Sequence, residues 1–194
     1  MTGTKKPETT NSRQPNNNNH SLIITEINQK EVEKQLLLLG YKKGDTVFLR
    51  GFLPSTHPNK STDKGRKATV KNINQLIRTA AEWKAQGLGV YLVVNGGGHT
   101  DNEVLFCRTV FYEHDNLNKE SQTVLWQSLN LPVPTFQIDT GGKSIHSYWV
   151  INSGDSPDNW RKLQTDLLEY ADADRSLKNP SRVMRLAGCL HSSG

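Results

Sequence analysis

Cysteine and long apolar stretches are both scarce in this sequence of 194 residues. The cysteines, Cys107 and Cys189, are too few for a disulfide framework or, by themselves, for a zinc site, so we expect no zinc. No window approaches the roughly 20 consecutive apolar residues that a membrane-spanning helix needs. A charged-then-apolar leader is not seen at the start of the sequence. We therefore expect a cytoplasmic protein that does not act in a membrane.

Hydrophobic residues are also few. They make up 34% of the chain, and the mean hydropathy is −0.65. A share this low predicts that part of the chain is disordered. Residues 1–20 are the candidate, because they are polar, contain a run of asparagines and show no apolar periodicity. We expect residues 21–194 to form the folded domain, as the front part of a longer protein.

The rest of the chain alternates between helical and extended patterns. Apolar spacing predicts helices at residues 27–39, 70–86 and 119–129, and a fourth that follows Ser156 as N-cap. Apolar, β-branched runs predict strands at residues 46–52, 89–95, 105–113, 136–139 and 145–151. Residues 54–67 are typical of a loop, and the tail from residue 175 of a loop or a short helix. The predicted fold class is α+β, with a mostly antiparallel sheet against helices.

Two carboxylates lie at the end of the predicted strand at residues 105–113: Glu113 is its last residue, and Asp115 is just beyond it. Residues two apart on a strand point to the same face, where like charges repel unless a cation lies between them. Hard cations such as Mg²⁺ or Mn²⁺ take oxygen ligands of this kind. The alternative is a strand end that simply enters solvent.

A second candidate element is the run Gly141-Gly142-Lys143-Ser144-Ile145-His146. Glycines let backbone N–H groups approach an anion, and a hydroxyl and an imidazole on one face of a strand donate to phosphate oxygens. The run lacks the GxxxxGK[ST] spacing of a Walker A loop, and a strand follows it instead of a helix. The alternative is an ordinary turn with an incidental serine and histidine.

A third element lies near the end of the chain. Asp174 is able to complete the carboxylate set, with Asp172 as its competitor. Arg182 and Arg185 are spaced to share a helical face, where they would meet phosphates or the acidic cluster. The alternative is a frayed helix end with solvated charges.

Together the three elements resemble the archaeo-eukaryotic primase superfamily, in particular the primase–polymerases of plasmids, phages and mobile elements. That family carries an acidic pair, then SxH, then a hydrophobic residue followed by Asp. Here Glu113-His114-Asp115, Ser144-Ile145-His146 and Ala173-Asp174 are similar to these motifs, and so are the stretches TGGKSIHSYW and NPSRVMRLAG. The resemblance covers about residues 46–188. The acidic pair departs from the family by placing Glu first, which keeps two carboxylates but alters the metal geometry.

The resemblance implies an N-terminal α/β lobe and a second lobe with an antiparallel sheet like that of an RNA-recognition motif, with the active site in the cleft between them. It implies that Glu113, Asp115 and Asp174 hold one or two Mg²⁺ or Mn²⁺ ions for nucleotidyl transfer. It further implies a triphosphate site made by the polar residues of the later motifs: Lys143, Ser144, His146, Arg182 and Arg185.

The implied activity is that of a DNA primase or polymerase, which takes NTPs or dNTPs and a single-stranded DNA template. A net charge of +5 and a pI near 9.2 agree with a polyanionic partner. Candidates for contacts to nucleic-acid phosphates are Arg50, Lys60, Lys64, Arg66 and Lys67, with a solvated surface as the alternative. The resemblance also suggests a prokaryotic, plasmid- or mobile-element-associated protein with a helicase or accessory domain downstream.

Two other functions remain open from the sequence. The domain fits a non-catalytic replication initiator, which binds nucleic acid or nucleotide with little catalysis. It also fits a metal-dependent nuclease, since paired carboxylates serve hydrolysis as well. The SxH strand argues against the nuclease, which has no need of a triphosphate cradle.

Overall fold

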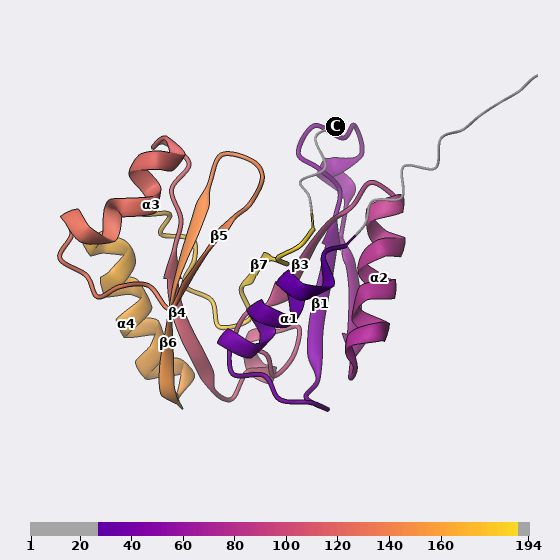
Figure 1. The fold of residues 1–194 in the computed structure, drawn as a ribbon, viewed down its shortest axis with the longest axis horizontal. Coiled ribbons are helices and arrows are strands. Elements are labelled where there is room, and N and C mark those ends of the chain that lie inside the picture. Colours follow the sequence, from indigo (N-terminus) through magenta and orange to yellow (C-terminus); the bar gives the residue numbers. More distant parts are fainter. Residues whose placement is uncertain (1–26, 190–194) are drawn as a thin grey trace, which may run out of the picture.

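The computed structural model describes residues 27–189, which form an α+β fold with two antiparallel sheets (Figure 1). The predicted disordered segment, residues 1–20, lies outside the described residues. The helices are α1 (Gln29–Leu38), α2 (Ile73–Ala85), α3 (Lys119–Ser128) and α4 (Pro157–Tyr170), with short 3-10 helices η1 (Lys60–Thr62) and η2 (Asp101–Glu103). The first sheet has the order β2-β1-β3-β7, and its strands are Arg66–Val70, Val47–Phe52, Gly89–Val93 and Val183–Arg185. The second has the order β4-β6-β5, with strands Cys107–Tyr112, Ile145–Asp155 and Phe136–Asp139.

Each α-helix begins at a side chain that accepts a hydrogen bond from the first turn. Asn28, Asn72 and Asn118 do this for α1, α2 and α3, and Ser156 does it for α4. Such residues are preferred at this position because their side-chain oxygen satisfies an N–H group that has no partner inside the helix. The helix starts are therefore set locally by the sequence.

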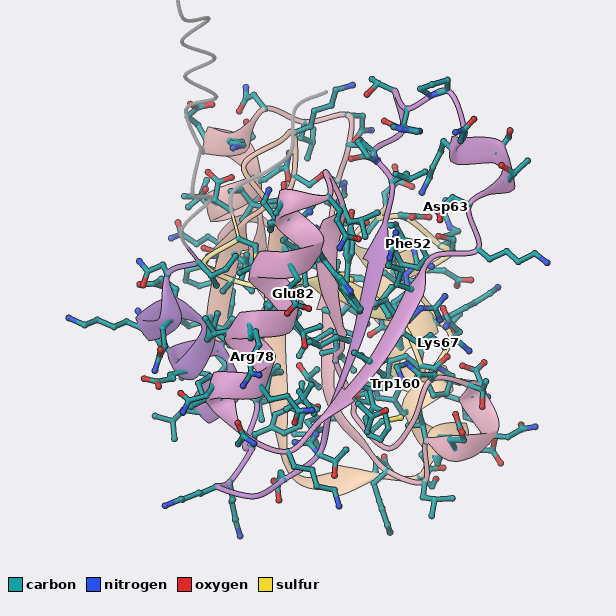
Figure 2. The ribbon with its side chains drawn as sticks, turned by 90° about the vertical axis from the view of Figure 1, so that its right-hand side faces the viewer. Phe52, Asp63, Lys67, Arg78, Glu82 and Trp160 are labelled. Atoms are coloured by element: carbon teal, nitrogen blue, oxygen red, sulfur yellow. The ribbon has the colours of Figure 1, made fainter. Side chains whose placement is uncertain are left out.

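The helix α2 buries one face of the first sheet. The ring of Trp83 packs on Gly51 of β1, where an added Cβ would lie 2.7 Å from the ring carbon Cε3. Leu49 lies beside them and is fully buried. On the outer side of the same helix, Arg78 and Glu82 are exposed (Figure 2). Only glycine allows strand and helix to approach this closely.

The second sheet packs against α3 and α4 (Figure 1). Trp160 of α4 is fully buried and donates its indole N–H to the backbone oxygen of Thr109 in β4 at 2.7 Å. Phe111 and Tyr148 are cross-strand partners on β4 and β6, and their ring centroids lie 5.9 Å apart. These buried aromatic side chains pack β4 against α4 and β6, directly before the residues that follow the strand.

Asn95 joins the two sheets where the chain passes from β3 towards β4. Its side-chain oxygen accepts hydrogen bonds from the backbone N–H groups of Arg108 and Thr109, at 3.0 and 3.3 Å. Its amide nitrogen donates to the backbone oxygen of Pro180 at 3.0 Å. The side chain is buried, so these bonds are shielded from water. One residue thus fixes the beginning of β4 and the segment before β7 relative to each other.

The predicted α+β class and antiparallel pairing are confirmed, as are most of the predicted elements. The strands at 89–95, 105–113 and 136–139 appear as β3, β4 and β5, and β5 pairs antiparallel with β6. Among residues 27–189, no helix is long and apolar enough to cross a membrane.

Two predicted segments are corrected. Residues 66–70 were expected to be the end of a loop and the start of a helix, but they form β2, and α2 begins only at Ile73. The tail forms β7, so Arg182 and Arg185 do not share a helical face: Arg182 precedes the strand and Arg185 ends it. Both strands owe their conformation to pairing with distant residues, β2 with β1 and β7 with β3.

Candidate active site

Glu113 and Asp115 come directly after the end of β4. Both line a pocket of about 540 Å³, together with Ser144 and His146 of the neighbouring segment. The opposite wall comes from the first sheet and the residues beside it: Ser55, Tyr91, Arg182, Val183, Met184 and Arg185. The Glu113 side chain is 19% exposed, whereas Asp115 is open to solvent. The pocket therefore receives polar groups from both sheets.

Each carboxylate of the acidic pair contacts one polar residue of the SxH motif. Ser144 donates a hydrogen bond from Oγ to Oδ1 of Asp115 at 2.8 Å, and Nε2 of His146 contacts Oε2 of Glu113. Ser144 and His146 are two positions apart at the start of β6, so their side chains share a face. The preceding turn is closed by Thr140, whose hydroxyl donates to the backbone oxygen of Ser144 at 2.8 Å.

The His146 ring is fixed from both sides. Its Nδ1 lies 3.3 Å from the hydroxyl of Tyr148, which is fully buried. Burial, together with the charge of Glu113, raises the pKa of Tyr148 well above its ordinary value, so the phenol keeps its proton. The ring is thus held between the phenol at Nδ1 and the Glu113 carboxylate at Nε2.

Glu113 is held in its charged form. Burial raises the pKa of its carboxyl, but the hydrogen bond from His146 and the positive charge of Arg182 outweigh burial, and the pKa lies below its ordinary value. An ionised carboxylate in a partly buried pocket is a strong ligand for a cation.

Asp174 lies in the loop after α4, on the Glu113 side of the pocket. Its carboxylate accepts hydrogen bonds from the backbone N–H and the hydroxyl of Ser176, at 2.9 and 2.8 Å. Its Oδ2 is 3.9 Å from Nη2 of Arg182, and its negative charge acts on Glu113. The competing Asp172 is exposed and pairs instead with Arg175 at 3.0 Å.

The three carboxylates have the oxygen-ligand chemistry that Mg²⁺ and Mn²⁺ prefer, and a paired, ionised Glu113 beside Asp115 fits such an ion. In the described part of the chain, however, no three Asp, Glu, His or Cys side chains are close enough together to hold a metal. Asp174 does not line the pocket, because its oxygens are turned to Ser176 and Arg182. Glu113 and Asp115 therefore share the pocket, whereas Asp174 lies outside its lining and acts on Glu113 through its charge.

The cations predicted to meet phosphates gather at the same pocket. Lys143, Arg182 and Arg185 all line it. Arg182 donates to the Ser176 hydroxyl at 3.2 Å, and Arg185 is buried with its guanidinium 4.5 Å above the ring of Tyr91. Three positive charges thus face the two carboxylates and the serine and histidine.

The other basic residues predicted to meet nucleic acid lie elsewhere, on β1, β2 and the loop between them. Arg50 and Lys67 are cross-strand partners, and Lys60 lies over the ring of Phe52, 5.2 Å from its centroid. Lys64 and Arg66 are exposed and do not line the pocket, nor do Arg50, Lys60 and Lys67. Figure 2 shows Phe52 and Lys67 along this hairpin.

A continuous row connects these basic residues to the pocket. The register pairs Lys67 with Arg50, Arg50 with Tyr91, and Tyr91 with Arg185, so the four side chains cross the open face of the first sheet in line. His99 packs edge-on against Phe48 beside them, and the charges of Lys67 and Arg50 help to lower its pKa, after burial. Tyr91 and His99 were missed from the sequence. The alternation Val90-Tyr91-Leu92 was the available signal for Tyr91.

Comparison with known proteins supplies relatives of known structure. No family model and no curated protein matches the chain. The chain is similar to the AEP (archaeo-eukaryotic primase) domain of the cyanophage S-2L primase-polymerase, with 35% identity, a TM-score of 0.75, and coverage of 86% of this chain and 85% of that one. It is also similar in fold to the primase RepB′, at 14% identity and a TM-score of 0.57, over 83% of this chain and 50% of that one. The RepB′ catalytic domain in complex with initiator DNA gives 14% identity and a TM-score of 0.56, over 84% and 78%.

Proposed function

The chain belongs to the archaeo-eukaryotic primase family, as an AEP domain of the primase-polymerase kind, and from this premise we propose that it is a DNA primase and polymerase that catalyses template-directed nucleotidyl transfer from NTPs or dNTPs. One observation carries the proposal. The Glu113–Asp115 pair meets the Ser144–His146 pair in one pocket, and Arg182 faces both. Carboxylates for metal and donors for phosphate are thus adjacent, as transfer from a triphosphate requires.

Glu113, Asp115 and Asp174 would hold one or two Mg²⁺ or Mn²⁺ ions. Bound there, the ions would favour ionisation of a primer 3′-hydroxyl and neutralise the charge of the leaving pyrophosphate. Asp174 joins the set when its carboxylate leaves Ser176, two residues away on the same loop. Arg182 also contacts Asp174, so binding of phosphate by Arg182 would remove one partner of that carboxylate.

The triphosphate would lie against Lys143, Ser144, His146, Arg182 and Arg185. Ser144 and His146 donate to carboxylates in the structure, and the same donors would serve phosphate oxygens in the presence of metal and triphosphate. In the reaction the primer O3′ forms a bond to the α-phosphorus as the bond from that phosphorus to the β-phosphate oxygen breaks. The hydroxyl proton leaves to solvent, and the cationic residues hold the departing pyrophosphate.

We further propose that the two sheets are the cores of two lobes. The first sheet with α1 and α2 would be the N-terminal α/β lobe, and the second sheet would be the lobe like an RNA-recognition motif. The pocket between them, lined from both, would be the active-site cleft. Residues 21–194 would then be the catalytic domain of a longer protein of phage or plasmid type, with a helicase or accessory domain downstream.

The template strand would follow the open face of the first sheet. The row Lys67, Arg50, Tyr91 and Arg185 leads to the pocket and offers cations for phosphates and a ring for base stacking. Lys60, Lys64 and Arg66 extend the positive charge beyond that row. The RepB′ catalytic domain was crystallised with initiator DNA, which supports DNA as the partner.

A priming and extension assay tests this function. A single-stranded DNA template, with and without a labelled primer, is incubated with NTPs or dNTPs and with Mg²⁺ or Mn²⁺. Template-dependent, metal-dependent products support the proposal. Degradation of the labelled strand identifies a nuclease instead. Salt-dependent DNA binding without any product, and without metal-dependent nucleotide binding in calorimetry, identifies a non-catalytic initiator.

A further inference from the structure

Three helices each place one buried glutamine against the backbone of a segment that carries site residues. Gln35 of α1, Gln122 of α3 and Gln164 of α4 are 2%, 1% and 0% exposed. In each case the amide oxygen accepts from a backbone N–H and the amide nitrogen donates to a backbone C=O. A side-chain amide offers one acceptor and one type of donor, as a peptide group of a neighbouring strand does.

We propose that Gln164 and Gln122 are positioning residues of the nucleotidyl transfer site: Gln164 sets the carboxylates that hold metal, and Gln122 sets the donors that hold triphosphate. This inference rests on the proposed function and assigns roles within it. Neither side chain lines the pocket, so both act through the backbone of other residues.

Gln164 joins the two segments from which the three carboxylates come. Its Oε1 accepts from the N–H of Phe111 at 3.1 Å, and its Nε2 donates to the C=O of Phe111 at 2.7 Å and of Leu177 at 3.0 Å. Phe111 lies two residues before Glu113, and Leu177 three residues after Asp174. Since β4 is an edge strand, Gln164 completes the hydrogen bonding of its outer edge. The separation of Glu113 and Asp174 therefore depends on this amide.

Gln122 joins the two segments that meet at Asp115 and Ser144. Its Nε2 donates to the C=O of Leu117 at 2.7 Å and of Lys143 at 2.9 Å, and its Oε1 accepts from the N–H of Ile145 at 2.7 Å. Lys143 and Ile145 flank Ser144, so the amide fixes the peptide groups on both sides of that residue. The direction of the Ser144 and His146 side chains depends on it.

The test compares Gln164→Met and Gln122→Met, which keep the side-chain length and remove the amide, with Gln137→Met as a matched control. Gln137 in β5 is half-buried and donates to the Thr123 C=O and the Ser147 hydroxyl, but to no backbone group beside Glu113, Asp174 or Ser144. Mn²⁺ binding is measured by calorimetry without nucleotide, and the KM and kcat for nucleotide are measured at saturating Mn²⁺. Thermal unfolding reports the stability of every variant.

Gln164→Met should weaken Mn²⁺ binding by about 10-fold to 100-fold, as removal of an outer-shell partner does, and leave the nucleotide KM within about threefold. Gln122→Met should raise the KM by about tenfold and leave Mn²⁺ binding within about threefold. Gln137→Met should change neither. If the two glutamines have only a structural role, both variants should lose Mn²⁺ binding and nucleotide binding to the same extent, in proportion to their loss of stability. That result overturns the proposal. Wild-type Mn²⁺ binding by Gln164→Met overturns it as well.

Two arrangements keep the test decisive. Where Gln164→Met does not fold, Gln164→Asn replaces it, because it keeps an amide that is one methylene too short to reach Phe111 and Leu177 together. Wild-type protein that binds Mn²⁺ but makes no product contradicts the proposed function. In that case Mn²⁺ binding by Gln164→Met still tests the role of Gln164. Wild-type protein that binds no Mn²⁺ overturns the role of Gln164 directly.

Discussion

Ser144 Oγ lies 2.8 Å from Oδ1 of Asp115, although the two residues are 29 positions apart in the chain. The contact exists because β4 and β6 are antiparallel neighbours, so the residues that follow β4 lie beside those that begin β6. A hydroxyl and a carboxylate are thereby brought together at one end of the sheet. The same geometry brings His146 to Glu113.

Asp115→Asn should lower nucleotidyl transfer by about a hundredfold or more, because it removes a full negative charge from the place where metal and pyrophosphate charge must be balanced. Asp115 is exposed and receives one side-chain hydrogen bond, from Ser144. The free energy of unfolding should therefore stay within about 0.5 kcal/mol of the wild-type value. Primer extension measures the activity, and urea unfolding measures the free energy of unfolding. Full activity of the variant would remove Asp115 from the set of metal ligands.

Asp174→Asn should also lower transfer strongly, whereas Asp172→Asn should leave it unchanged. The charge of Asp174 reaches Glu113, while Asp172 pairs with Arg175 at the surface. Asn is the matched replacement at position 172, where φ is 47°, because it tolerates the left-handed conformation. Extension assays of the two variants in parallel decide the assignment. Loss of activity in Asp172→Asn alone would reverse it.

The sequence predicted the elements that are determined locally. Ser156 was predicted as the cap of the helix that follows it, and the apolar, β-branched run at residues 89–95 was predicted as a strand. Asn28 and Asn72, which cap α1 and α2, were not predicted, and both helices begin later than expected. The predictions were wrong where pairing with a distant strand determines the backbone conformation. The strand β2, Arg66–Val70, has one buried side chain, Val70, and its sequence alone carries no strand pattern. Its conformation comes from the ladder with β1.

For the candidate site, sequence motifs indicated residue types but not their partners. The SxH motif predicted that Ser144 and His146 share a face, yet not that each faces a different carboxylate. Gln122 and Gln164 were passed over because a glutamine in a helix is ordinarily a surface residue. Their role follows from burial against another segment, which no local pattern reports.

Lys67→Gln should weaken binding to single-stranded DNA and reduce the slope of log K against log salt by roughly 0.7, the value expected when one lysine no longer neutralises a phosphate. Lys67 is exposed on β2 and stands next to Arg50 on the open face of the first sheet. Lys30→Gln, on the exposed side of α1, is the matched control for net charge. Fluorescence anisotropy at several salt concentrations measures both. Equal slopes for the two variants would place the template elsewhere.

Gly51→Ala should destabilise the fold by about 1–3 kcal/mol, the usual range for overpacking a core. The new methyl group would lie 2.7 Å from Cε3 of Trp83, and the ring is held between β1 and α2. Urea unfolding of the purified variant measures the change. Because Gly51 belongs to the first sheet and not to the pocket, the KM for nucleotide at low temperature should stay near the wild-type value. Unchanged stability would mean that Trp83 is free to move aside.

The two thiols should resist alkylation at pH 8. Burial raises the pKa of Cys107 from 9.0 to about 12 and that of Cys189 from 9.0 to about 11, so almost no thiolate is present in the folded protein. Iodoacetamide should therefore label the native protein at least about a hundredfold more slowly than the urea-unfolded chain, as followed by mass spectrometry. Because the unfolded chain loses these protons at lower pH than the folded one, both thiols make stability fall as pH rises above about 9. Rapid labelling of the native protein at pH 8 would show that the segments around Cys107 or Cys189 open readily.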